Sequence, residues 1–100
     1  MILLYEIVFS LKAKKQFLGL EKTTQERIIS ALERIRIRPE FFVTKLVGDP
    51  GYKLRVGDYR IIIDIDKNNM MILVIKVGHR KNIYSSQQPK YLPAKIIFFY

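Results

Sequence analysis

The sequence predicts an α+β domain in which an N-terminal strand and a helical hairpin pack on one face of an antiparallel sheet. Apolar residues recur at helical spacing in two stretches between residues 10 and 38. Residues 52–79 instead alternate apolar and polar side chains over three stretches separated by short turns, as consecutive antiparallel strands do. A chain of 100 residues is long enough for one hydrophobic core, so we expect a single domain over residues 1–100.

The first predicted elements are a short apolar strand, Leu3–Phe9, and a short helix directly after it. Ser10 suits the N-cap of this helix, because its hydroxyl can accept a bond from a free backbone N–H. The buried side of the helix is expected to consist of Ala13, Phe17 and Leu20. Its lysines are interpreted as a solvated face, with nucleic-acid contact as the alternative: Lys12, Lys14 and Lys15.

A second helix is predicted to end before Pro39. Thr23 and Glu26 have the spacing of a capping box, in which each side chain binds a backbone N–H of the first turn. The apolar stripe of this helix is expected to consist of Ile28, Leu32 and Ile35, reinforced by Ile29. We expect the two helices to form a hairpin over the apolar face of the sheet, with a short strand at Thr44–Val47 following them.

The central hairpin is predicted from Tyr52–Val56 and Tyr59–Asp66, joined by Gly57-Asp58. A two-residue loop that begins with glycine favours a tight hairpin, because glycine adopts positive φ without steric cost. The register that follows places Arg55 opposite Arg60.

A third strand is predicted after the loop Lys67-Asn68-Asn69, because asparagine tolerates the left-handed conformation. With this loop, Arg60 lies opposite Lys76 and Ile61 opposite Ile75. Strand side chains alternate between two faces. The apolar face is predicted to collect Leu54, Val56, Ile61, Ile63, Ile65, Leu73, Ile75 and Val77. The other face collects Lys53, Arg55, Arg60 and Lys76, and Arg80 continues its parity.

The second face of this sheet carries like charges on neighbouring strands. Like charges directly opposite each other destabilise a sheet, within a span of roughly 0.2–1 kcal/mol per pair. Arg55 against Arg60 against Lys76 is therefore a poor arrangement for folding alone, and it favours a site that binds a polyanion. The alternative is a solvated basic face without a ligand.

The composition limits the classes of protein to which this chain can belong. The formal net charge is +9, and 49% of the residues are hydrophobic, as in a globular domain. A surplus of this size predicts attraction to phosphate-rich partners or to an acidic protein. The chain has no cysteine and one histidine, so we expect neither a disulfide nor a metal site. No apolar run approaches a membrane span and no signal peptide is recognisable, so we expect a cytoplasmic protein.

Four fragments resemble the RelE/ParE toxin superfamily of prokaryotic toxin–antitoxin modules. In chain order they are Lys45-Leu46-x-Gly48, Tyr52-Lys53-Leu54-Arg55, Gly57-Asp58-Tyr59-Arg60 and Val77-Gly78-His79-Arg80-x-x-Ile83-Tyr84. Each fragment alone is weak evidence, but their order and spacing are specific. The resemblance covers most of the chain and implies two helices packed on a curved antiparallel sheet. It leans towards RelE, an mRNA interferase that cleaves messenger RNA in the ribosomal A site.

The RelE resemblance implies a catalytic set that coincides, the tyrosine aside, with the set obtained from strand parity: Lys53, Arg55, Arg60, Arg80 and Tyr84. The reaction it implies is attack of a ribose 2′-hydroxyl on the adjacent phosphorus, without metal or other cofactor. This reaction requires a proton acceptor, stabilisation of the phosphorane charge and a proton donor for the leaving oxygen. Further RNA contacts are expected from Lys45, Lys76, His79 and Lys81.

The expected roles follow from the chemistry of each side chain. Arg55 and Arg60 bind the phosphate, because guanidinium groups hold two oxygens at once. Lys53 is the base, its pKa lowered by the neighbouring cations. Arg80 stabilises or protonates the leaving group, and Tyr84 stacks on or orients a base.

This sequence departs from RelE proteins at Arg55, where many of them carry a lysine that is a candidate general base. Arginine stays protonated at neutral pH, so the base has to be Lys53 or His79, or catalysis rests on positioning. His79 shares the parity of Val77 and of the core face, which favours a structural role for it. For Tyr84, a core role is the alternative.

Two alternative functions are compatible with the same fold. A ParE-like protein would poison DNA gyrase by binding and would cleave nothing. A non-enzymatic RNA-binding member would bind RNA in a salt-dependent manner without cleavage. In both toxin readings the partner is a RelB-like antitoxin, expected to be acidic and partly disordered when free. It would cover the basic face or displace the C-terminal segment, residues 85–100, whose course the sequence leaves open.

Overall fold

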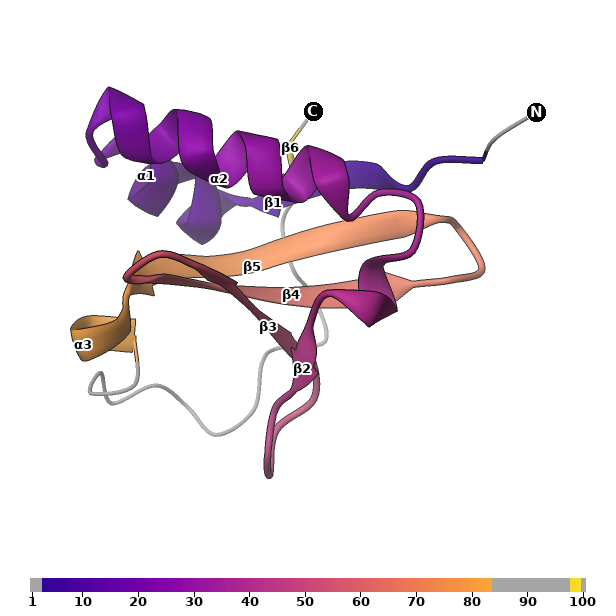
Figure 1. The fold of residues 1–100 in the computed structure, drawn as a ribbon. Coiled ribbons are helices and arrows are strands. Elements are labelled where there is room, and N and C mark those ends of the chain that lie inside the picture. Colours follow the sequence, from indigo (N-terminus) through magenta and orange to yellow (C-terminus); the bar gives the residue numbers. More distant parts are fainter. Residues whose placement is uncertain (1–2, 84–97, 100) are drawn as a thin grey trace.

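Two helices lie on one face of a six-stranded sheet in the computed structural model, which describes residues 3–83 and 98–99 (Figure 1). The elements, in chain order, are β1 (Glu6–Ser10), α1 (Leu11–Leu18), α2 (Lys22–Arg34), the 3₁₀ turn η1 (Pro39–Phe41), β2 (Thr44–Lys45), β3 (Tyr52–Val56), β4 (Tyr59–Asp66), β5 (Met71–His79), α3 (Arg80–Ile83) and β6 (Phe98–Phe99). The predicted α+β architecture is confirmed. The sheet has the order β2-β3-β4-β5-β1-β6 and is mixed rather than wholly antiparallel, because β1 runs parallel to β5.

The first helix begins as its sequence predicts. The Oγ atom of Ser10 accepts a hydrogen bond from the backbone N–H of Ala13 at 3.0 Å. The same hydroxyl donates to the carbonyl oxygen of Ile75 at 3.0 Å, so the cap also ties α1 to β5. A second tie follows one turn later, where the Oε1 atom of Gln16 accepts from the N–H of Val77 at 2.8 Å.

The capping box predicted at Thr23 and Glu26 is wrong. Helix α2 begins at Lys22, and its N-cap residue makes no side-chain hydrogen bond to the first turn. Because α2 begins at Lys22, Gln25 lies in its first turn, against the end of α1. There Nε2 of Gln25 donates to the carbonyl oxygens of Phe17 at 3.2 Å and Leu20 at 3.0 Å, which satisfies acceptors that a helix C-terminus leaves unpaired.

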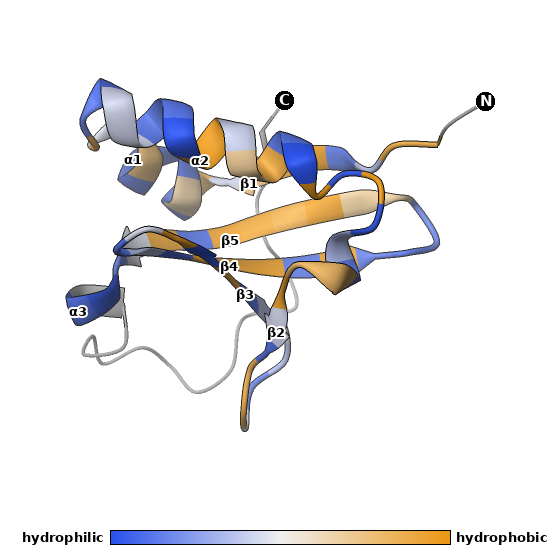
Figure 2. Cartoon of the chain, in the orientation of Figure 1, coloured by the Kyte–Doolittle hydropathy of each residue, from blue (hydrophilic) through white to orange (hydrophobic). Residues whose placement is uncertain are grey.

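The main core lies between the helices and the sheet. The predicted stripe of α2 is confirmed, since Ile28, Leu32 and Ile35 are at most 1% exposed, whereas Ile29 faces solvent. Figure 2 shows apolar residues along β4 and β5 beneath the helices. Each fully buried aliphatic side chain contributes roughly 1.5–3 kcal/mol. The buried members of the cluster are Tyr5, Ala13, Ile28, Leu32, Ile35, Leu54, Ile61, Ile63, Ile72, Val74 and Val77.

The register predicted for the first hairpin is confirmed in every pair. Arg55 lies opposite Arg60, and Lys53 lies opposite Ile62. Gly57 has φ +58° at the first position of the turn, the left-handed conformation for which glycine was expected.

The register predicted between β4 and β5 is wrong. Arg60 lies opposite Gly78 rather than Lys76, and Lys76 lies opposite Ile62. The turn is one residue longer than predicted, Lys67–Met70, with the left-handed conformation at Met70 (φ +55°) rather than at an asparagine. A register shift between Ile62 and Ile63 adds a further residue on the β5 side, as in a β-bulge.

The longer turn changes which β5 side chains enter the core. Val74 and Ile72 pair with β4 residues of the core face and are fully buried, in place of the predicted Leu73 and Ile75. Ile75 joins a small second cluster with Ile62 and Leu46. Lys76 and Val77 keep the faces predicted for them, because the bulge lies before them in the strand.

The chain ends were open questions in the sequence. Phe98–Phe99 forms β6, antiparallel to β1, so the apolar tail adds a strand to the sheet. Tyr84 and the turn-rich segment 87–93 lie outside the described residues. Within residues 3–83 and 98–99, no helix has the length and apolar character needed to cross a bilayer.

Candidate nucleic-acid interface

A basic face lies on the side of the sheet away from the helices. We use this name for Lys53, Arg55, Arg60 and Lys76. Along β3, Lys53 and Arg55 flank Leu54, which is buried in the core, so the two cations point to the opposite side. Arg60 lies on the same side because it pairs with Arg55. Lys76 also lies there, because it pairs with Ile62, which in turn pairs with Lys53. The structure therefore brings these four residues of three adjacent strands onto one face.

Arg60 is the buried member of the basic face, with 9% of its surface exposed. Its Nη1 atom donates to the carbonyl oxygens of Gly57 at 3.4 Å and Tyr59 at 3.2 Å. A guanidinium carries five N–H donors in a fixed plane, and these two bonds do not use the donors on Nε and Nη2. Arg60 is thus held in place by the hairpin turn and keeps the donors that a phosphate requires.

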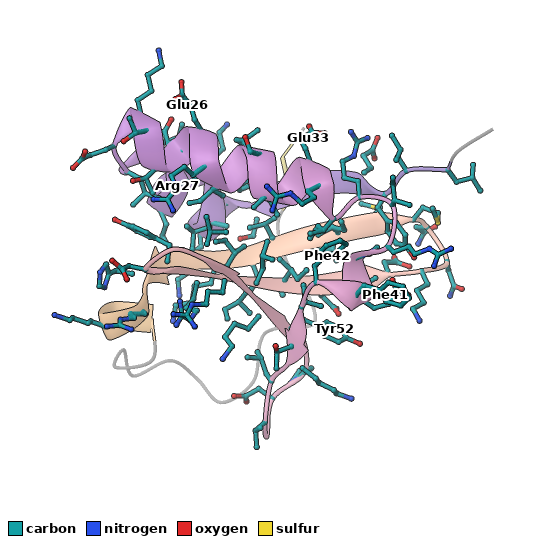
Figure 3. The ribbon with its side chains drawn as sticks, in the orientation of Figure 1. Glu26, Arg27, Glu33, Phe41, Phe42 and Tyr52 are labelled. Carbon is teal, nitrogen blue, oxygen red and sulfur yellow. The ribbon has the colours of Figure 1, made fainter. Side chains whose placement is uncertain are left out.

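The Gly57-Asp58 turn joins the basic face to two other elements. The N–H of Arg80 donates to the carbonyl oxygen of Asp58 at 2.8 Å, which fixes the start of α3 beside the turn. From above, Arg27 of α2 reaches the turn: a Cβ added at Gly57 would lie 3.0 Å from its Nη2 atom (Figure 3). The sequence did not single out Arg27, since nothing in its spacing separates it from other solvated helix residues.

His79 lies on the helix side of the sheet. It pairs with Tyr59, which packs against the core, and the two rings meet edge to face with centroids 5.5 Å apart. Its Nδ1 atom accepts a hydrogen bond from the N–H of Lys81 at 3.2 Å, at the start of α3. The structure does not bring His79 together with Arg55 and Arg60, and this agrees with the structural alternative raised by its parity.

Of the remaining predicted residues, the structure describes Arg80, Lys81 and Lys45, and none of them belongs to the basic face. Arg80 and Lys81 are exposed on α3, which Figure 2 shows as hydrophilic. Lys45 is exposed on β2, where its pairing with Tyr52 gives it the helix-side parity. Tyr84 cannot be placed, because it is outside the described residues. No group of three or more His, Asp or Glu residues able to hold a metal ion occurs in the described part of the chain.

Lys76 is a member of the basic face whose pKa is altered. Burial, and after it the nearby positive charge of Lys12, lower the pKa of its amine from the ordinary value of 10.5. Lys76 lies beside the first turn of α1, because Ser10 at the start of that helix donates a hydrogen bond to the carbonyl oxygen of Ile75.

A groove of about 520 Å³ separates α2 from the β3 edge. Its basic lining residues are Arg27 and Arg34 of α2 and Arg55 of β3, and Glu26 adds one carboxylate. Strand β2 pairs with β3 only at Tyr52 and Lys53, so this groove runs along the stretch of β3 that lies beyond β2. Sequence reasoning missed it, since its two walls are neighbours only after folding.

Comparison with known families decides the identity. Residues 7–84 match the family model described as the ParE toxin of the type II toxin–antitoxin system, parDE. The match runs from β1 through α3 and so includes the whole basic face. This chain belongs to the RelE/ParE toxin superfamily. The resemblance inferred from the sequence fragments is confirmed.

Solved structures of RelE/ParE superfamily toxins share the fold. A chain of the intact E. coli RelBE toxin–antitoxin complex is 30% identical, with a TM-score of 0.64 over 75% of this chain and 95% of that one. A mutant of the E. coli toxin RelE in the free state is 28% identical, with a TM-score of 0.67 over 81% and 88% of the two chains. The RelBE2 complex of Mycobacterium tuberculosis matches at 18% identity and a TM-score of 0.71, over 82% and 98%, which shows the fold alone. Among proteins with curated descriptions, no significant sequence match is found.

Proposed function

We propose that this toxin is a ribosome-dependent endoribonuclease, which cleaves messenger RNA in the ribosomal A site and so inhibits translation. The observation that carries the proposal is the convergence of Lys53, Arg55 and Arg60 on one sheet face, with Arg80 tied to the same hairpin turn. Lys53, Arg60 and Arg80 match the RelE motif, whereas Arg55 stands where many RelE proteins carry a lysine. The similarity to solved RelE toxins gives the proposal its direction.

The proposed reaction is an in-line displacement at phosphorus. The ribose 2′-oxygen forms a bond to the phosphorus, the bond to the 5′-oxygen breaks, and the product carries a 2′,3′-cyclic phosphate. One group must accept the 2′-hydroxyl proton and another must donate a proton to the leaving oxygen. Donors aimed at the non-bridging oxygens stabilise the charge that develops in the transition state.

Roles are assigned to the residues by their geometry. Arg60 presents its guanidinium from a fixed position, and Arg55 lies directly opposite it on β3, so the pair can bind the phosphate from two sides. Lys53, two residues before Arg55 on the same face, accepts the proton. Arg80, at the start of α3, stabilises or protonates the leaving group, and Tyr84 orients a base of the RNA.

The proposed partners are the ribosome with its messenger RNA, and a RelB-like antitoxin. Structural neighbours of this chain include toxins in complex with RelB. The net charge of +9 favours an acidic antitoxin segment that is disordered when free and folds on binding. Such a segment neutralises the toxin by covering the basic face or by displacing the C-terminal segment.

The second candidate function is binding of DNA gyrase, as for a ParE-like toxin. It is favoured by the description of the matching family model, which names ParE. Gyrase binding needs no catalytic set on the basic face. The two functions are separated by testing the purified toxin in parallel, in a gyrase supercoiling assay and in a cell-free translation reaction analysed by primer extension.

The experiment on the catalytic set uses Arg55→Ala, because Arg55 is exposed and we expect its removal to leave the fold intact. We expect the rate of codon-phased cleavage to fall on the order of 10²–10³-fold, the size seen when one transition-state donor is removed. The matched control is Arg38→Ala, which removes an exposed arginine just before η1, outside the basic face, and should cleave at the rate of the wild type. Equal cleavage by the wild type and Arg55→Ala would contradict the assignment.

A further inference from the structure

Lys12 and Lys76 are neighbours although they belong to different elements. Ser10 ties the first turn of α1 to the carbonyl of Ile75, the residue before Lys76. Gln16 ties the next turn of α1 to the N–H of Val77, the residue after it. Helix α1 therefore runs along β5 past Lys76, and Lys12 lies in the turn between the two ties.

Lys76 belongs to the basic face, and Lys12 extends this face towards α1. Lys53, Ile62 and Lys76 lie in register across three strands. Adjacent strands are about 4.8 Å apart, so the backbones of Lys53 and Lys76 are separated by about 10 Å. Lys12 lies beyond Lys76, on the side remote from β3. The cations thus form a row across the strands, within the reach of one short stretch of RNA.

The pair has the properties of an anion site. Lys76 is half-buried, and its burial and then the positive charge of Lys12 disfavour the protonated form of its amine. A phosphate between them would reverse this effect, because it interacts favourably with both ammonium groups. The stems of such lysines can rest on apolar surface, and Ile62 and Ile75 form a small apolar cluster beside Lys76.

We propose that Lys12 and Lys76 together bind one RNA phosphate, adjacent to the phosphate held by Arg55 and Arg60. The inference rests on the proposed function, because it takes the ligand to be RNA. It gives a role in substrate binding to Lys12, for which the sequence favoured a solvated face over nucleic-acid contact. It also implies that the RNA strand crosses β3, β4 and β5 rather than running along them.

The test measures binding of a fluorescent, non-cleavable 2′-O-methyl RNA oligonucleotide to the purified toxin over a range of salt concentrations. Each phosphate contact on a single strand contributes about 0.7 to the slope of log affinity against log salt. Lys12→Gln and Lys76→Gln should each lower the slope by about 0.7. The double variant should lose no more than either single one, because both remove the same contact.

Two controls sharpen the result. Lys22→Gln removes an exposed lysine from the start of α2 and should leave the slope unchanged, whereas Lys12→Arg keeps the charge and should retain the wild-type slope. Equal slopes for Lys12→Gln and Lys22→Gln would overturn the inference, and so would a wild type that does not bind the oligonucleotide. Additive losses in the double variant would overturn the shared phosphate. Because the probe is not cleaved, these outcomes are independent of the cleavage assay that tests the proposed function.

Discussion

The guanidinium of Arg60 donates through Nη1 to the carbonyl oxygen of Gly57, three residues earlier in the same hairpin. A residue of the candidate catalytic set therefore also stabilises the turn that positions it. Arg55, directly opposite, is exposed and has no such structural duty in the hairpin turn. The two arginines should consequently respond differently to substitution.

Arg60→Ala should lower both cleavage and stability. Hydrogen bonds of a charged group contribute roughly 1.5–3 kcal/mol, so we expect a loss of that order in the free energy of unfolding, measured by urea denaturation. Arg55→Ala should lower cleavage alone. The account is contradicted if Arg60→Ala unfolds at the same urea concentration as the wild type.

Gln16→Leu should destabilise the fold. The substitution removes the acceptor for the N–H of Val77, which the structure places 2.8 Å from Oε1 of Gln16. A buried donor left without a partner costs about 1–3 kcal/mol. Gln16→Glu keeps an accepting oxygen at this position, now that of a carboxylate, and should remain close to the wild type in thermal unfolding. If both variants lose equal stability, the contact to Val77 has no energetic weight.

Gly57→Ala should cost more than Gly48→Ala. Both glycines have left-handed backbones, with φ of +58° and +81°, so alanine carries a conformational cost of about 1–2 kcal/mol at each. Only at Gly57 does the new Cβ also meet Arg27, whereas nothing lies within 4 Å at Gly48. Chemical denaturation of the two variants measures the difference, and Arg27→Ala in the Gly57→Ala background should reduce it.

Stability should fall in acid partly through Asp66. Hydrogen bonds from the side chain and backbone of Asn69 lower the pKa of this carboxyl below its usual 3.8. The folded state therefore releases this proton more readily than the unfolded state, and the contribution is fully present above pH 3.8. It is lost as the pH falls through the lower, folded pKa. Unfolding of the wild type and Asp66→Asn should differ at neutral pH and converge below that pKa.

Most of the fold could be predicted because local signals specify it. The alternation of Leu54 with Lys53 and Arg55, together with the glycine-led turn, determined the register of the first hairpin. The second register could not be obtained in the same way. A turn of four residues instead of three and a β-bulge each shift the register by one residue without a sequence mark, so the partner of Arg60 is Gly78 instead of Lys76.

The site was predictable to the extent that it depends on strand parity. Lys53, Arg55, Arg60 and Lys76 share a face because the bulge restores the parity that the longer turn had shifted. The sequence left nucleic-acid contact by Lys12 open and could not decide it, since its place relative to the basic face depends on how α1 lies along β5.

The most direct test of the central claim is primer extension on messenger RNA translated in a cell-free system with the purified toxin. The account predicts codon-phased cuts with the wild type, and on the order of 10²–10³-fold slower cutting with Arg55→Ala. The absence of cuts with the wild type, or cuts that persist unchanged in Arg55→Ala, would contradict it.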